Sequence, residues 1–185
     1  MSSSAIAPVS RALPSAATPP AASAKARFWD RIAPKYAADP IADLAGYEAT
    51  LQRVQGLLSP QHDVLEIGCG TGSTALRLAP FTRSLLATDV SSQMIAIAHQ
   101  RLAAQPSAAL RFAVADAEAM APGPEVYDAV LAFNVLHLMT DLDDALRQLV
   151  KVLRPGGLLI SKTACIAEMN PLIPYLAVPL MRAIG

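Results

Sequence analysis

The residues with the clearest capacity for chemistry lie at positions 64–72, which read Val-Leu-Glu-Ile-Gly-Cys-Gly-Thr-Gly. An apolar run leads to Glu66, and glycines follow at positions 68, 70 and 72. Glycine has no Cβ, so the backbone can turn sharply there and approach a ligand closely. A helix that starts after such a loop directs free N–H groups and a partial positive charge at that ligand. The stretch therefore predicts a cofactor site at the end of a strand.

The glycine spacing favours one kind of cofactor over another. A dinucleotide-binding loop reads G-x-G-x-x-G, and its third glycine would fall where this chain has Ser73. The chain has instead an acidic residue followed by G-x-G-x-G. An NAD-dependent oxidoreductase is therefore retained only as an alternative interpretation.

Polar residues recur at the ends of four of the five predicted strands. These strands are segments 64–67, 84–88, 110–115, 127–133 and 157–163, each rich in apolar residues. One acidic or amide residue stands near the end of each of the first four: Glu66, Asp89, Asp116 and Asn134. Because ligands of open α/β sheets bind outside the carboxyl ends of the strands, we expect these side chains to share one site.

Helices are predicted between the strands, at 43–58, 73–79, 92–103 and 141–153, and near the start, where Phe28, Ile32 and Tyr36 share one face. The alternation predicts a Rossmann-like α/β fold: a doubly wound, mostly parallel sheet in a three-layer α/β/α arrangement. Ser91 is the expected N-cap of one helix, and Thr140 that of the last. Pro155-Gly156-Gly157 is expected to stop the last helix.

Composition argues against several classes of protein. Apolar residues make up 53% of the 185 residues, but no run of about 18 is uninterrupted, so no membrane span is expected. Lys and Arg total 15, as do Asp and Glu, so the basic excess of a nucleic-acid binder is absent from the sequence. Cys69 and Cys165 belong to no CxxC or Cys/His cluster, so we expect no metal and no disulfide framework, and a reducing cytoplasmic location.

The ends of the chain differ from its middle. Residues 1–24 are rich in Ala, Ser and Pro, and we expect a disordered leader, with an organelle transit peptide as the alternative. Residues 25–185 are long enough for one domain with a substantial core.

Taken in order, five segments resemble the class I S-adenosylmethionine (SAM)-dependent methyltransferases, in particular small-molecule enzymes of the ubiquinone/menaquinone-biosynthesis type. The segments are residues 66–72, 89–94, 116–117, 127–134 and 153–157. Each is weak by itself, but together with the strands that carry them they span residues 64 to 163, more than half of the chain. The resemblance implies SAM as cofactor and methyl transfer as the reaction.

The resemblance also implies which residues hold the methionine end of SAM. The backbone at Gly68, Gly70 and Gly72 would approach it, with Cys69 inside the same loop. Glu66 would help to hold the loop and the amino group. Cys69 has an alternative interpretation as a small apolar filler of the core.

The adenosine end would lie on the next two strands. Asp89 would accept the ribose hydroxyls, and Val90 and Met94 would flank the adenine. Asp116 and the Ala117 backbone N–H would read the adenine edge. A single Asp at a strand end is also a common cap or turn residue, and Val90 and Met94 would suit the core equally well.

Three further residues complete the predicted site. Asn134 would lie by the sulfonium, and Tyr36 on the N-terminal helix would cover the cofactor. His137 is the candidate catalytic base for a hydroxyl or phenol acceptor, because His62 precedes the first strand and His99 lies on a helix. The alternatives are a capping role for Asn134, a packing helix around Tyr36 and a structural histidine at 137.

The resemblance has a limit at the C-terminal side. The family's sheet normally has seven strands, whereas five are predicted here, followed by an apolar, proline-punctuated segment at 170–181. An open apolar sheet edge invites self-association, so we expect a fragment of a longer product, a tail that covers the edge, or a homo-oligomer.

These observations predict a methyltransferase that moves the methyl group of SAM to a small-molecule acceptor. The alternatives are an NAD-dependent oxidoreductase and a truncated SAM-binding or interaction domain without catalysis. The sequence leaves open the acceptor and whether carbon, oxygen or nitrogen is methylated.

Overall fold

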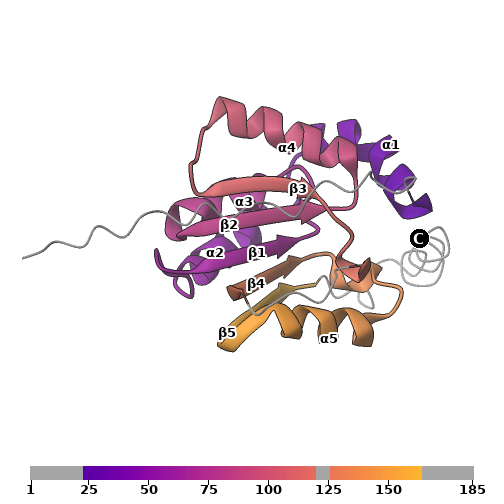
Figure 1. Ribbon diagram of the computed structural model, residues 1–185. Helices are drawn as coiled ribbons and strands as arrows, with labels where there is room; N and C mark the ends of the chain where they lie inside the picture. The colour runs from indigo at the N-terminus through magenta and orange to yellow at the C-terminus, as the bar shows by residue number, and fades with distance from the viewer. Residues whose placement is uncertain (1–22, 120–125, 164–185) are drawn as a thin grey trace, which may run out of the picture.

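A computed structural model describes residues 23–119 and 126–163 of the chain (Figure 1). Its five strands form one sheet in the order β3-β2-β1-β4-β5, and every neighbouring pair is parallel. The strands are β1 (Asp63–Ile67), β2 (Ser84–Asp89), β3 (Leu110–Val114), β4 (Tyr127–Phe133) and β5 (Leu153–Lys162). The strand order reverses at β1, between β2 and β4, which is where open α/β sheets bind their ligands. The predicted parallel, doubly wound sheet is confirmed.

Five helices are described around this sheet. They are α1 (Ala24–Ala38), α2 (Leu44–Gln55), α3 (Ser73–Leu78), α4 (Ser92–Ala104) and α5 (Leu142–Val152). Single 3-10 turns lie at Ala79–Phe81 (η1), Ala117–Ala119 (η2) and Leu136–Leu138 (η3). The first helix begins at Ala24, ahead of the Phe28–Tyr36 face from which it was predicted.

The helices bury the two faces of the sheet in two separate cores. On one face, Leu51 of α2, Leu78 of α3 and Ala98 of α4 pack with strand residues such as Val64 and Phe112. On the other face, the α5 side chains Ala145, Leu149 and Val152 pack on β1 and β4. Because successive residues of a buried strand point to opposite faces, Val64 and Leu65 belong to different cores. The three-layer arrangement follows.

Several predicted boundaries were wrong at the last helix and strand. The N-cap of α5 is Asp141, whose side chain accepts from the Asp144 N–H, and not Thr140. Leu142, the first residue of the helix, is 41% exposed, because the helix turns Ala145 and Leu149 to the core. The strand begins at Leu153 and not at 157, since Leu153 already pairs with Tyr127.

The Pro155-Gly156-Gly157 sequence forms an irregularity inside β5 and not a turn before it. Regular pairing resumes at Leu158, opposite Ala129, so extra residues bulge between the two pairs. Gly156 has φ +78°, and a Cβ there would meet no atom within 4 Å. Glycine is therefore needed at position 156 because the bulge requires a left-handed backbone conformation there.

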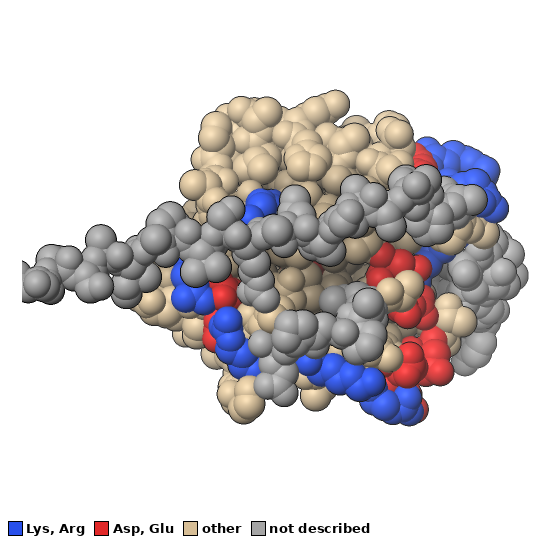
Figure 2. Space-filling model, in the orientation of Figure 1, with Lys and Arg blue, Asp and Glu red and all other residues tan. Residues whose placement is uncertain are grey.

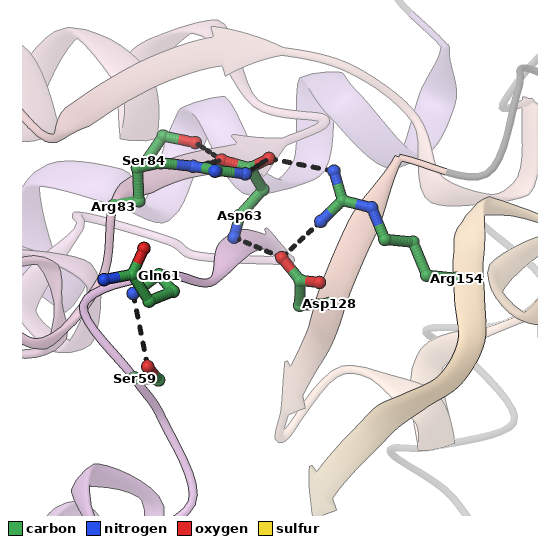
Figure 3. A network of polar contacts seen from close by, with 7 residues as sticks. All are labelled: Ser59, Gln61, Asp63, Arg83, Ser84, Asp128 and Arg154. Carbon is green, nitrogen blue, oxygen red and sulfur yellow. Dashed lines mark hydrogen bonds and ion pairs between the residues drawn. The ribbon is translucent and has the colours of Figure 1, made fainter. Parts of the chain in front are cut away.

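An ion-pair network closes the amino ends of four strands (Figure 3). The Asp63 carboxylate accepts hydrogen bonds from Arg83 Nε at 2.9 Å, Ser84 Oγ at 2.8 Å and Arg154 Nη2 at 3.0 Å. Asp128 accepts from the Asp63 N–H at 2.7 Å and from Arg154. These contacts join β1, β2, β4 and β5 at the end of the sheet opposite the predicted site.

The network stabilises the charged forms of its two acids. Hydrogen bonds from Arg83 hold the pKa of Asp63 well below its usual range. At Asp128 burial raises the pKa, but hydrogen bonds from Arg154 and the Asp63 N–H outweigh burial and lower it. Because folded-state pKa values below the unfolded ones add stability only while the acids are ionised, this contribution is lost as the pH falls.

The remaining predictions about the ends of the chain lie outside the described residues. These are the leader at 1–24 except for Ser23 and Ala24, Cys165 and the apolar segment at 170–181. Within the described ranges, no helix is both long and apolar enough to cross a membrane.

Removing the guanidinium that bridges the two acids should destabilise the fold. We expect Arg154→Met to lower the free energy of unfolding by about 1–2 kcal/mol at neutral pH, because the half-buried Asp63 and Asp128 lose a donor. The difference from wild type should shrink as the pH falls below about 4, as both acids become protonated. Urea denaturation across this pH range measures it. The control is Arg147→Met, which breaks an exposed pair with Asp144 and should change little.

Candidate functional site

A cavity of about 620 Å³ lies at the carboxyl ends of the strands, where the site was predicted. This volume is in the usual range for small-molecule sites. The ends of β1, β2 and β4, the segment after β3, helix α1 and the segment that follows α1 all contribute to its wall. Figure 2 shows acidic side chains gathered on the side of the molecule toward which the strands run.

The structure brings almost every predicted site residue to this one cavity. The residues in its wall are Tyr36, Glu66, Gly68, Cys69, Gly70, Asp89, Val90, Met94, Asp116, Ala117, Asn134 and His137. Gly72 is the exception. Their contacts with a ligand stay predictions, but their convergence is a property of the fold.

Gly72 and Gly70 of the loop have different surroundings, so glycine is needed at the two positions for different physical reasons. At Gly72, which has φ +76° and caps α3, a Cβ would lie 2.5 Å from Phe112 Cζ and 3.0 Å from Ala98 Cβ. The Gly72 position is therefore set by packing of the loop against β3 and α4, not by the cavity. Gly70 has φ +53° and lies in the cavity wall. The nearest atom to a Cβ there would be Cε1 of Tyr36, another wall residue, at 3.6 Å.

Asp89 holds the glycine loop and the start of α4 together. Its Oδ2 accepts from the Gly70 N–H at 2.8 Å, and its Oδ1 from the Ser91 N–H at 2.9 Å. Burial raises the pKa of Asp89, although these two backbone bonds act in the opposite direction. Val90 lines the cavity, and Met94 does so while only 2% exposed, so Met94 also belongs to the core.

Glu66 is a buried carboxyl group at the cavity wall. It is 2% exposed, and its Oε2 accepts no hydrogen bond from the described residues. Burial, followed by the charge of Asp89, raises the pKa of Glu66 to about 8. A buried acceptor without a donor is rare in folded proteins and calls for an explanation. A cationic donor group on a ligand in the cavity would satisfy it, so this residue fits a cofactor that carries an ammonium group.

The segments after β3 and β4 form the opposite part of the wall. Asp116 Oδ1 accepts from the Glu118 N–H at 3.0 Å, which shapes the turn that presents Ala117. Asn134 has φ +53°, the one positive value at a non-glycine residue in the described part of the chain. Its N–H donates to the Lys162 carbonyl at 2.7 Å, and His137 follows in the turn η3.

Helix α1 lies against α4 and reaches the cavity through Tyr36. Asp30 of α1 accepts from Ser91 Oγ at 2.6 Å and from the Gln93 N–H at 2.9 Å, so it caps the start of α4. The Tyr36 ring is in the cavity wall, but the residue is 54% exposed. The helix is thus held where Tyr36 could cover a ligand, and that covering role stays a prediction.

Sequence reasoning missed several residues of the wall. Thr71 and Ser73 adjoin the glycines and could have been found from that position. The others come from elements whose packing the sequence does not specify, and they include Lys25, Trp29, Ile41, Tyr47, Arg101, Phe133, Val135, Leu138 and Met139.

Comparison with known proteins agrees with this site. The family described as "Methyltransferase domain" matches residues 64–157, slightly more than half of the chain. The non-reducing polyketide synthase dpmpA of Macrophomina phaseolina is 36% identical over 147 residues, which are 72% of this chain and 6% of dpmpA. The methyltransferase GfsG of Streptomyces halstedii is 33% identical over 122 residues, 64% of this chain and 44% of GfsG. The chain therefore spans less than half the length of either relative.

Solved structures show the same fold. The [4+2]-cyclase SpnF superposes with a TM-score of 0.65 at 27% identity, over 76% of this chain and 60% of SpnF. Structures of this fold include complexes with SAM or with S-adenosylhomocysteine (SAH). The chain therefore belongs to the methyltransferase-domain family and has the fold of the class I SAM-dependent methyltransferases, which use SAM. The predictions of fold, family and cofactor are confirmed.

The burial of Glu66 should lower the free energy of unfolding of the ligand-free protein in a pH-dependent way. An acid whose folded-state pKa is raised destabilises the fold as the pH rises from its unfolded value of 4.5 to about 8. We therefore expect Glu66→Gln to gain stability relative to wild type over this range, by about 1–3 kcal/mol. Urea denaturation without ligand at several pH values measures the difference. A difference that does not change with pH would contradict the assignment.

Proposed function

We propose that this protein transfers the methyl group of SAM to a small-molecule acceptor. The observation that carries the proposal is the buried Glu66 carboxyl group beside the glycine loop, with its Oε2 lacking a donor. SAM offers a cationic amino group in that position. A dinucleotide would instead bring a negatively charged pyrophosphate to the glycine loop and no ammonium group for Glu66. The site therefore supports SAM over NAD.

The roles proposed for the other residues follow from their places in the wall. Gly68, Cys69 and Gly70 would lie along the methionine end, and Tyr36 would close over it. Gly72 supports the loop from behind by packing on Phe112.

The adenosine end would lie over β2 and β3. Asp89 keeps lone pairs for the ribose hydroxyls beyond the two backbone bonds it accepts. Asp116 and the Ala117 N–H would bind the adenine edge, between Val90 and Met94.

The bound cofactor would supply an activated methyl group on its sulfonium, so little acid–base chemistry is asked of the chain. The residues here would orient the two reactants and exclude water. Asn134, held in a left-handed conformation, would border the reacting end. His137 lies in the same wall and would take a proton from the acceptor.

The acceptor side of the cavity supports an apolar acceptor. Phe133, Val135, Leu138 and Met139 contribute its wall after β4, and Ile41, from the segment after α1, lines the same cavity. The relatives named as polyketide synthases, among them dpmpA, agree with an apolar, oxygen-bearing acceptor. We propose that class, in place of a nucleic acid.

The location and assembly of the protein are further proposals. Equal numbers of basic and acidic residues and the buried free thiol of Cys69 support a cytoplasmic protein that binds no nucleic acid. The half-exposed side chains Leu158 and Leu159 on the outermost strand β5 support a homo-oligomer through that edge.

One rival has a specific observation in its favour. SpnF shares the fold but is named as a [4+2]-cyclase, so this fold also serves reactions other than methyl transfer. A SAM-binding domain without methyl transfer is therefore the second candidate.

Ligand-induced stabilisation separates SAM from NAD. We expect SAM and SAH at about a hundred times their Kd to raise the free energy of unfolding by about 2.7 kcal/mol, and NAD to have no effect. Thermal unfolding of the full chain with each ligand checks this. Stabilisation by NAD alone would refute the proposal, and SAM binding without transfer to a panel of phenols and β-dicarbonyls would favour the second candidate.

The role of His137 is testable once an acceptor from that panel is found. We expect His137→Ala to lower kcat by about a hundredfold or more, because the acceptor proton loses its base, while the Kd of SAM changes little. Transfer of tritiated methyl groups and calorimetric titration with SAM measure the two quantities. His99→Ala, outside the cavity wall, is the matched control. Full turnover in the His137 variant would exclude the histidine as base.

A further inference from the structure

Arg101 of α4 reaches across the wall of the cavity to the glycine loop. Its Nη1 donates to the Thr71 carbonyl at 3.2 Å, to Thr71 Oγ1 at 2.6 Å and to Ser73 Oγ at 2.5 Å. Its Nη2 donates to the Ala37 carbonyl at the end of α1, at 3.2 Å. The guanidinium is half-buried and lines the same cavity as Glu66 and Asp89.

All the partners of this guanidinium are uncharged oxygens. Among the described residues, two Lys or Arg side chains lie in the cavity wall, Lys25 and Arg101. Lys25 forms an ion pair with Glu118, whereas Arg101 has no carboxylate within 4.0 Å in the described part of the chain. Arg101 thus places in the wall a positive charge that has no ion-pair partner within residues 23–119 and 126–163. A guanidinium in such a position favours binding of a carboxylate.

Glu66 and Arg101 adjoin opposite ends of the same loop. Glu66 precedes Gly68, and Arg101 is bonded to Thr71 and Ser73 at the other end of the loop. The buried acid lacks a cation, and the arginine lacks an anion. An amino-acid group, which carries an ammonium and a carboxylate on one carbon, would supply both.

We propose that Arg101 binds the α-carboxylate of the amino-acid end of the cofactor. The inference rests on the proposed function, since it takes SAM as the ligand. The hydroxyls of Thr71 and Ser73 hold the guanidinium in place, and Glu66 receives the ammonium group of the same ligand. Arg101 is thereby a binding residue that selects for the intact amino-acid group.

A purely structural role for Arg101 leads to a different result. The bonds to Ala37 and Thr71 also attach α1 to the loop, so any variant could disturb the cavity. Such a disturbance would weaken all ligands of the site alike. A carboxylate contact would weaken only ligands that have the carboxylate.

Calorimetric titration with three ligands distinguishes these outcomes. SAM has both charged groups, decarboxylated SAM keeps the ammonium and sulfonium, and 5′-methylthioadenosine has neither part of the amino-acid group. We expect wild type to bind SAM about tenfold to a hundredfold more tightly than decarboxylated SAM. Arg101→Gln should remove most of this preference and leave the Kd of methylthioadenosine within about threefold. Arg101→Lys should retain part of the preference.

The control variant is Arg147→Gln, which removes an exposed arginine from α5 outside the cavity wall and should keep the wild-type preference. An Arg101→Gln variant that also keeps that preference would overturn the inference. The inference would also be overturned if wild type preferred SAM over decarboxylated SAM by less than about threefold. That measurement needs no variant, so it tests the inference even if Arg101→Gln fails to fold. No binding of SAM by wild type would refute the proposed function itself.

Discussion

The cavity depends first on the two backbone hydrogen bonds that Asp89 accepts. One carboxylate at the end of β2 binds the Gly70 N–H and the Ser91 N–H, and so holds the loop after β1 and the start of α4 at one point. Asp30 of α1 binds Ser91 Oγ and the Gln93 N–H from the other side. Three elements that are distant in sequence are thereby joined where the strands end. A loop that depends on positive φ values has little stability of its own, so this attachment gives the cavity its shape.

The acidic residues at the two ends of the sheet have pKa values shifted in opposite directions. At the amino ends, Asp63 and Asp128 are matched by Arg83 and Arg154, and their pKa values fall. At the carboxyl ends, burial raises the pKa of Glu66, and no arginine of the described segments is paired with it. The first arrangement stabilises the fold, whereas the second stores a cost that a cationic ligand group would relieve. Stability and binding are therefore provided at opposite edges of one sheet.

The family and the fold do not by themselves determine the reaction, which depends on the side chains of the site. A parallel sheet with this strand order serves SpnF, named as a cyclase, as well as proteins named as methyltransferases. In this chain the site consists of the side chains at the strand ends, with an apolar wall after β4. The match over residues 64–157 includes the strand-end residues and the apolar residues after β4, whereas Tyr36 and Ile41 of the cavity wall lie outside it.

The sequence by itself determined the strands, most helices and the place of the site, because alternating apolar runs and glycine spacing are local signals. It also placed Asp89, Asp116 and Asn134 correctly, since the carboxyl ends of parallel strands must meet at one edge. Only the tertiary structure showed that Gly72 packs on Phe112, that β5 begins at Leu153 with a bulge, and that Arg101 reaches the loop. Each of these is a contact between elements far apart in the chain. Such contacts are decided by how helices and strands pack, which no local pattern specifies.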